Sequence, residues 1–361
     1  QQQKQRDKNW FFHAYKITPL RRFIPRRYAK TRKKAKIVHR LSHSPMLPPT
    51  DGQHRLDAAL AWLRRSIEAC RGQGSSHSWS PLFGWAGAYP ETTGYLIETL
   101  LDCAELKQDH ELRSLAFSCA DWLLSIQMPD GAFAGLLAGH HQPSVFNTSQ
   151  ILFGLARVSP ENEAARKGLA HAVQWLLDML ETDHAWRRHA YVEGFVPSYY
   201  SRAVWGVLKA NLVLRQPETE QAMRLALQWY AGRMLPNGAV RDWGFRPGAA
   251  AFTHTIGYTF EGFLESALLL DDKDLIEKEI LTGDKFLKIR NQAGGRTAGR
   301  YDEQWRGDYS FLCVTGNCQL SLFFQRLWEI SGEPRFREAA RSLLAEVLPL
   351  SPLPLVGVLS R

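Results

Sequence analysis

Residues 120–135 read ADWLLSIQMPDGAFAG and contain both signals that decide the fold. A bulky pair, Trp122-Leu123, lies on an amphipathic segment, and Pro129-Asp130-Gly131 then marks a helix exit, where glycine supplies a positive φ. Five similar pairs occur at Trp62-Leu63, Trp175-Leu176, Trp229-Tyr230, Phe286-Leu287 and Leu343-Leu344. Successive pairs are separated by 60, 53, 54, 57 and 57 residues. This period is too long for one helix and indicates a repeated supersecondary unit.

Each unit reads as an outer helix, a loop and an inner helix. The outer segments have apolar residues at i, i+3, i+4 and i+7 with charges between them, which is typical of a helix with one wet face. They lie at about 54–70, 111–127, 162–181, 218–234, 274–290 and 334–347. The inner segments carry fewer charges and lie at about 92–106, 147–158, 199–214, 254–270 and 314–331.

Hairpins with buried inner helices close most naturally into a ring. We therefore predict an all-α fold, an (α/α)6-type toroid, over residues 54–361. The sixth inner segment, after Pro349, is short and proline-rich, so we expect the ring to be incomplete at this end. The alternative is an open solenoid, which would expose one face of every inner helix to water. The apolar inner faces favour the toroid.

Residues 1–40 form a basic, aromatic arm, and residues 41–53 read as a linker. The arm holds 14 of the 45 Lys/Arg and one of the 36 acidic residues, so its net charge is +13 while residues 41–361 carry −4. This arm suits an anionic membrane surface. The alternative is a solvated arm whose aromatics pack on the body. Nucleic acid is the least favoured partner, because the body offers no basic face to continue the contact.

The rest of the composition predicts a soluble protein. No apolar run reaches the roughly 18 residues of a membrane span, and none resembles a signal peptide. The five cysteines include no CxxC pair and predict reduced thiols. We expect the protein in the cytoplasm, with peripheral contact at the inner membrane through residues 1–40 as one possibility.

Two resemblances support the toroid. The segment from Ser125 to Gly135 resembles the glutamine and Asp-Gly repeat of prenyltransferase and terpene-cyclase toroids. The repeats from about 54 to 347 are similar to the (α/α)6 barrels of sugar enzymes, namely N-acylglucosamine 2-epimerases, unsaturated glucuronyl hydrolases and the toroid domain of uronate C5-epimerases. These resemblances imply a scaffold that hosts many chemistries, so activity has to be argued from the site.

Parallel inner helices would place their N-termini, with partial positive charge, on one rim of the ring. The segments leading to that rim are rich in arginine and aromatic residues, which suit carboxylates and sugar rings. We expect an acidic saccharide to bind there. The candidate binding residues are Arg202, Asp242, Trp243, Arg246, Arg300, Trp305, Asp308, Asn317, Asn147 and His141. The alternative roles are sealing of the barrel by Trp and Arg, and helix capping by Asn and Asp.

Two motifs supply candidate acids. Residues 89–95, YPETTGY, open the first inner helix and place Glu91 and Tyr95 on one face. For Glu91 the alternative is a carboxylate that complements the helix dipole. Residues 193–202, EGFVPSYYSR, open the third and offer Glu193, Tyr199 and Arg202. We expect Tyr199 to lie beside Arg202, whose charge would favour a phenolate.

A third motif supplies the candidate base. Residues 253–261, THTIGYTFE, open the fourth inner helix, with His254, Tyr258 and Glu261 along one face. A histidine at the mouth of a charged cavity suits a general base near neutral pH. The segment resembles the His-containing inner helix of N-acylglucosamine 2-epimerases. The alternative is a histidine that only fills the core.

No cofactor or metal is expected. The chain has no Walker A loop, dinucleotide fingerprint or Gly-x-Ser-x-Gly elbow. A zinc site from Asp308, Cys313 and a histidine is a minor alternative, because Cys313 and Cys318 lack metal-ligand spacing. Asp271 and Asp272 read as a solvated turn.

The sequence therefore predicts a carbohydrate-active enzyme whose favoured reaction is epimerisation of the uronate C5 type. Proton removal and return need two acid/base groups flanking the sugar and a cation for the developing enolate. A lyase or an unsaturated-uronide hydrolase is the first alternative, the latter using the carboxylates of Glu91 and Asp242. A prenyl or terpenoid cyclase and a noncatalytic scaffold of polysaccharide synthesis are the others.

Overall fold

The computed structural model describes residues 52–348, except 138 and 140. This part of the chain contains eleven α-helices. Six are outer helices: α3 (Gly52–Ala69), α5 (His110–Ser125), α7 (Glu163–Asp178), α9 (Pro217–Ala231), α11 (Lys273–Gln292) and α13 (Pro334–Val347). Five are inner helices: α4 (Pro90–Lys107), α6 (Val145–Val158), α8 (Ser201–Leu214), α10 (Thr253–Leu270) and α12 (Val314–Ser331).

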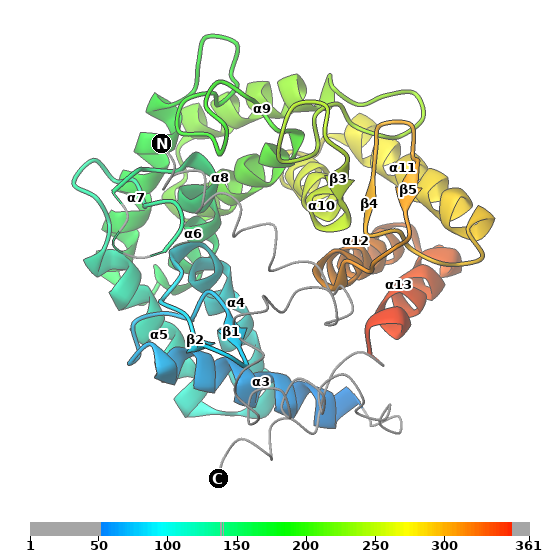
Figure 1. Ribbon diagram of the computed structural model, residues 1–361. Coiled ribbons are helices and arrows are strands. Elements are labelled where there is room, and N and C mark those ends of the chain that lie inside the picture. The colour runs from blue at the N-terminus through cyan, green and yellow to red at the C-terminus, as the bar shows by residue number, and fades with distance from the viewer. Residues whose placement is uncertain (1–51, 138, 140, 349–361) are drawn as a thin grey trace, which may run out of the picture.

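The helices form two concentric layers (Figure 1). Each inner helix packs against the next one along the chain, from α4 through α6, α8 and α10 to α12, and the outer helices surround them. The two ends of the described chain meet, because Nη1 of Arg55 in α3 donates a hydrogen bond of 2.7 Å to the carbonyl oxygen of Leu348. The predicted all-α toroid is confirmed. The predicted incomplete sixth inner segment falls on residues 349–361, outside the described residues.

The two rims of the toroid differ in their connections. Turns of two to four residues join each inner helix to the next outer one, for example 108–109 and 271–272. Segments of 19–22 residues join each outer helix to the next inner one, for example 70–89 and 179–200. All N-termini of the inner helices therefore lie at the long-loop rim, and their C-termini lie at the short-turn rim.

The long-loop rim carries the short strands. Strands β1 (Trp79–Ser80) and β2 (Gly84–Trp85) form an antiparallel ribbon with Trp79 opposite Trp85. Strands β3 (Ala251–Phe252), β4 (Arg300–Tyr301) and β5 (Gly307–Asp308) form a small antiparallel sheet with β4 in the middle. A 3₁₀ turn, η2 (Ser198–Tyr200), precedes α8.

The short-turn rim is built by local capping. Asp109, Asn162 and Asp272 each accept backbone N–H groups at the start of α5, α7 and α11. Four of the five inner helices end on a residue with a left-handed backbone, among them Asp271. The predicted turn role of Asp271 and Asp272 is thus confirmed.

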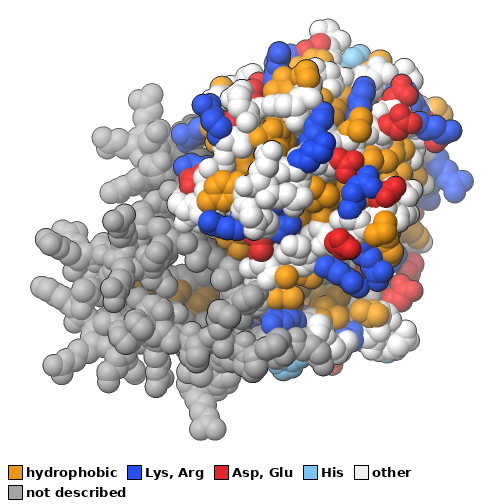
Figure 2. Space-filling model, turned by 90° about the vertical axis from the view of Figure 1, so that its right-hand side faces the viewer, with side chains coloured by type: hydrophobic (Ala, Val, Ile, Leu, Met, Phe, Trp, Pro, Cys, Tyr) orange, Lys and Arg blue, Asp and Glu red, His pale blue; other side chains and the backbone are white. Residues whose placement is uncertain are grey.

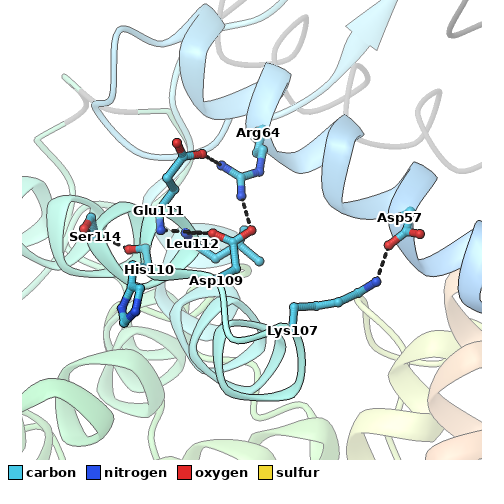
Figure 3. A network of polar contacts seen from close by, with 8 residues as sticks. All are labelled: Asp57, Arg64, Lys107, Asp109, His110, Glu111, Leu112 and Ser114. Atoms are coloured by element: carbon cyan, nitrogen blue, oxygen red, sulfur yellow. Dashed lines mark hydrogen bonds and ion pairs between the residues drawn. The ribbon is translucent and has the colours of Figure 1, made fainter.

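Ion pairs connect the first outer helix, α3, to the end of α4 and to the start of α5 (Figure 3). Arg64 of α3 donates to Asp109 at 2.6 Å and to Glu111 at 3.1 Å, both at the start of α5. Lys107 at the end of α4 pairs with Asp57 at 2.5 Å. These side chains are partly or largely exposed, so each pair contributes little to stability.

Glycines let the inner helices approach closely. A Cβ atom added to Gly94 in α4 would lie 2.5 Å from the Cα atom of Ile151 in α6. One added to Gly154 in α6 would lie 2.2 Å from the carbonyl oxygen of Gly94. This explains why the inner segments hold small residues although glycine weakens a helix.

The outside of the ring shows no dominant charge on the side that holds α11 and α13, where acidic, basic and apolar side chains alternate (Figure 2). No described helix is long and apolar enough to cross a membrane. All five cysteines are free thiols, and three of them are buried. The arm and linker predicted at 1–53 fall almost wholly outside the described residues.

Candidate functional site

Three inner helices place an ionisable residue at the same position. Glu91, Arg202 and His254 are the second residues of α4, α8 and α10. Because the inner helices are parallel, all three lie at the long-loop rim. Each is nearly buried, with Glu91 9% and His254 4% exposed and the Arg202 side chain 11% exposed.

Arg202 is the centre of this cluster. Its Nε donates to Oε1 of Gln150 in α6 at 2.8 Å, and its Nη1 donates to Oε2 of Glu261 in α10 at 2.5 Å. The guanidinium also lies over three rings, 4.6 Å from the centroid of Tyr258, 4.9 Å from Trp205 and 5.3 Å from Phe153. One cation therefore links α6, α8 and α10. Within the described residues no hydrogen bond uses its Nη2.

Glu91 is the most perturbed acid of α4. Burial raises the pKa of its carboxyl to about 7, against the hydrogen bond from Tyr89 and the charge of Arg202, which lower it. The hydroxyl of Tyr89 donates to Oε2 at 2.8 Å. At neutral pH Glu91 is thus divided between the acid and the carboxylate, which is the state a proton-transfer group needs.

Glu261 is a second buried carboxyl in the cluster. Burial raises its pKa to about 7, and Arg202 opposes that shift. The next acid on this helix face, Glu265, instead pairs with Arg326 of α12 at 2.8 Å. The two glutamates on the face of His254 therefore have separate partners, and only Glu261 belongs to the cluster.

The phenols of the cluster are protonated at neutral pH. Burial raises the pKa of Tyr258 to about 12, although Arg202 and a hydrogen bond with Tyr95 both lower it. Burial raises the pKa of Tyr199 well above its usual value, and Glu91 and Tyr258 raise it further. Tyr199 packs edge-on against Phe146 at 5.1 Å. The expectation that Arg202 favours a phenolate at Tyr199 is wrong, because the pKa of this phenol is raised and the guanidinium lies over the rings of Tyr258, Trp205 and Phe153.

His254 is a buried, neutral imidazole. Burial lowers its pKa to about 4. Its Nδ1 lies 3.9 Å from the Sγ of Cys313, and its ring packs against Tyr258 at 5.8 Å and Phe245 at 5.3 Å. The structure thus brings His254 beside Tyr258 as predicted. Its affinity for a proton is lower than that of Glu91, which weakens its case as the general base.

Several predicted binding residues form ion pairs or hydrogen bonds with each other or with other residues of the loops. Asp242 forms an ion pair with Arg233, and its backbone N–H donates to Glu303. The use of Asp242 with Glu91 as a carboxylate pair of a hydrolase stays a prediction, in which Asp242 would act from within its ion pair with Arg233. Arg300 and Asp308 pair with each other at 2.8 Å across β4 and β5.

Of the two predicted stacking tryptophans, Trp243 belongs to the hydrophobic core and Trp305 is a partly buried residue that packs against it. Trp243 is fully buried and cannot stack on a sugar. Trp305 packs against Trp243 at 5.0 Å and Phe286 at 5.7 Å, and its Nε1 donates to the carbonyl oxygen of Asn237. These rings hold the β4–β5 hairpin against the barrel, so the sealing role is the correct one for Trp243, while stacking of Trp305 on a sugar stays a prediction.

The remaining predicted residues lie around the cluster. Glu193, His141 and Arg246 are exposed. Burial raises the pKa of the nearby Tyr191, and Arg246 opposes that shift. Asn147 accepts from Ser144 and donates to the carbonyl oxygen of Ala134, so it shapes the start of α6. Asn317 is fully buried in the first turn of α12.

Two residues of the cluster were not predicted as site residues: Tyr89 and Gln150. Tyr89 stands inside a quoted motif, two residues before Glu91, whereas Glu261 was placed with His254 and Tyr258 on one helix face. Gln150 gave no signal, because an uncharged amide in an apolar helix has no distinctive spacing. Within the described residues, no group of three or more His, Cys, Asp or Glu side chains is arranged to hold a metal.

No known protein family and no curated protein sequence matches the chain. Solved structures do. An unsaturated glucuronyl hydrolase from Bacillus sp. GL1, described as responsible for glycosaminoglycan degradation, aligns with a TM-score of 0.62 at 17% identity over 83% of this chain and 84% of that one. A mutant of unsaturated glucuronyl hydrolase from Streptococcus agalactiae gives 0.55 at 13% over 86% and 80%.

Cellobiose 2-epimerase from Spirochaeta thermophila aligns with a TM-score of 0.54 at 12% identity, covering 82% of this chain and 79% of that one. At such identities the similarity establishes the (α/α)6 toroid and not the reaction.

Proposed function

We propose that the chain is a carbohydrate-active enzyme that acts on an acidic saccharide by proton transfer at the long-loop rim. The observation that carries this proposal is Glu91, a buried carboxyl with a pKa of about 7. Its electrostatic neighbours are Arg202 of α8, Tyr258 of α10 and Tyr199 of the turn η2. Perturbed acids that converge with a cation are typical of catalytic sites. The convergence favours an enzyme over a noncatalytic scaffold, and Arg202 favours an acidic substrate over a terpenoid.

The favoured reaction is epimerisation at C5 of a uronate. The carboxylate of Glu91 takes the proton from C5, and the electron pair of the broken C–H bond moves into an enolate of the sugar carboxylate. The hydroxyl of Tyr258 then donates a proton to the opposite face of C5. Transfer of the first proton from Glu91 to the Tyr258 oxygen through water restores the resting state.

The cation fits this chemistry. An enolate carries more charge on its oxygens than the carboxylate from which it forms, so Arg202 stabilises it selectively. Its Nη2 is the donor we assign to the sugar carboxylate, because Nε and Nη1 are held by Gln150 and Glu261. These two bonds and the three rings fix the orientation of the guanidinium.

The second candidate is hydrolysis of a uronide. It is favoured by the two buried carboxyls near Arg202, Glu91 and Glu261, each with a pKa of about 7, since glycoside hydrolysis uses a pair of acidic residues. Two of the similar structures are named glucuronyl hydrolases. In this reaction a protonated Glu91 would donate to the leaving oxygen.

Incubation of uronic-acid polymers and oligomers in heavy water tests the proposal. Deuterium at C5, detected by NMR, supports epimerisation. If new reducing ends appear without deuterium at C5, the reaction is hydrolysis and not epimerisation. If the absorbance of an unsaturated uronide appears, the reaction is that of a lyase. No change in any substrate of the panel contradicts an enzyme of acidic saccharides.

A further inference from the structure

The first unit of the toroid carries aromatic side chains that the proposed chemistry does not use. Trp62 of α3, Trp79 of β1, Phe83 of the ribbon turn and Trp85 of β2 form what we call the rim aromatic patch. The Trp62 ring lies 4.8 Å from that of Trp85 and 5.8 Å from that of Trp79. Trp62 is 40% and Phe83 68% exposed.

The repeat itself does not require this exposure. Trp62 begins the first of the six bulky pairs, and its counterparts Trp122 and Trp175 are 9% and 4% exposed. In the second and third units the tryptophan is therefore core, whereas in the first it lies at the surface. A large exposed ring is costly to retain in water and marks an interaction site more often than an isolated leucine does.

The patch is continuous with the candidate site. The ribbon extends to the bridge between Ser76 and Ala88, and the next residue, Tyr89, donates to Glu91. The His77 ring of the ribbon packs edge-on against that of Tyr89 at 4.9 Å. Tyr89 follows Trp85 by four steps of extended backbone, a span of about 13 Å. A saccharide of a few residues can bridge that span.

We propose that the rim aromatic patch is a saccharide-binding subsite that holds the part of an acidic polymer lying beyond the reacting residue. Aromatic rings bind the apolar faces of sugar rings. The guanidinium of Arg65 lies over the Trp62 ring at 5.8 Å and supplies a positive charge for a uronate. This inference rests on the proposed function for its ligand class.

A structural role of the same rings makes a different prediction. If the tryptophans only fasten the ribbon to α3, then exposed Phe83 contributes nothing to binding, and substitutions affect long and short ligands alike. A subsite instead affects long ligands alone, since a monosaccharide at Glu91 does not reach the patch.

The test uses the full chain with Phe83→Ser, Trp62→Leu and, as a matched control, Leu106→Ser, which changes an apolar side chain that is 70% exposed in the last turn of α4. Affinities for polygalacturonate, alginate, uncharged dextran and free galacturonate are measured by tryptophan fluorescence. Salt of about 0.5 M suppresses nonspecific attraction to the basic arm. All variants are repeated in a Glu91→Gln background, so binding is read without turnover.

We expect Phe83→Ser and Trp62→Leu each to weaken binding of at least one acidic polymer about five- to tenfold, with free galacturonate unchanged and Leu106→Ser without effect. Equal affinity of all variants for the polymers, or an equal loss for Leu106→Ser, would overturn the subsite. Because binding is measured in Glu91→Gln, this result is separate from the failure of the proposed reaction. If the chain with Glu91 intact binds the polymers but does not turn them over, the subsite proposal holds and the proposed enzymatic function is wrong.

Discussion

Turns of two to four residues close one rim of the toroid, whereas segments of 19–22 residues cover the other. The short turns use local chemistry, with Asp and Asn caps that accept N–H groups a few residues away. The long segments bring residues from distant units together, as when Arg202 contacts Gln150 and Glu261. The comparison separates the rim that stabilises the ring from the rim that can act on a ligand.

Two buried carboxyls show the same difference. Glu91 at the long-loop rim has a hydrogen-bond donor, Tyr89, and a nearby cation, Arg202. Glu279, in the second turn of α11 near the short-turn rim, is fully buried, and neither of its oxygens has a hydrogen-bond partner among the described residues. Burial alone raises its pKa well above the usual value. A perturbed acid is therefore a site candidate only where partners converge on it.

The largest effect should come from removing the acid of the long-loop rim. Glu91→Gln keeps the shape of the side chain and the contact with Tyr89 but cannot carry a proton. We expect turnover in the heavy-water assay to fall at least about 100-fold. Glu279→Gln, the same change at the other buried carboxyl, should leave turnover unchanged. Equal losses in both variants, or full activity of Glu91→Gln, would break the distinction between the rims.

The pH dependence of turnover sharpens this result. Epimerisation needs Glu91 as a carboxylate, so the rate should rise with pH up to about 7, the pKa that burial gives this residue, with a slope of about tenfold per pH unit below it. Hydrolysis needs the protonated acid, so its rate would fall above about 7. If the rate instead rises with pH only up to about 4, the general base is His254, because burial lowers the pKa of this residue to about 4.

The third prediction concerns the effect of Glu279 on the stability of the fold. The folded state keeps Glu279 protonated to a higher pH than the unfolded chain does, so its contribution to stability is lost progressively as pH rises above its usual pKa. Glu279→Gln should therefore raise the free energy of unfolding at pH 7 and change it little at pH 4. Denaturant unfolding at pH 4 and pH 7 checks this. A gain of the same size at both pH values would contradict it.

The features that the sequence predicts correctly are local ones, like those of the short-turn rim, and the features that it misses are contacts between units, like those of the long-loop rim. The repeat and the capping residues are local patterns, so the toroid, its turns and the element boundaries could be predicted to within a few residues. Glu91, Tyr258 and Arg202 were found because they lie in motifs at helix starts. The contact partners of these residues could not be predicted, because they depend on which units of the toroid lie next to each other. Arg202 was matched with Tyr199, three residues away, and contacts Tyr258 instead.

The exposure of the tryptophans could not be predicted for a related reason. Sequence shows that Trp243 lies in a loop near the rim but not whether the loop folds inward, and the ring is fully buried. Trp62 is the opposite case, because its counterparts Trp122 and Trp175 are buried while its own ring is 40% exposed. Exposure is a property of the assembled units, which no single unit encodes.

The smallest effect should come from the short-turn rim. Asp109 caps α5 by accepting the N–H groups of Glu111 and Leu112, both at 3.0 Å, and it pairs with Arg64. Asp109→Ala should lower the free energy of unfolding by about 1 kcal/mol. Asp109→Asn retains the capping oxygen and should recover most of this loss. Neither variant should change turnover per folded molecule, because the cap touches no residue of the Arg202 cluster. A loss of kcat in Asp109→Ala that exceeds the loss of folded protein would mean that the short-turn rim also shapes the site.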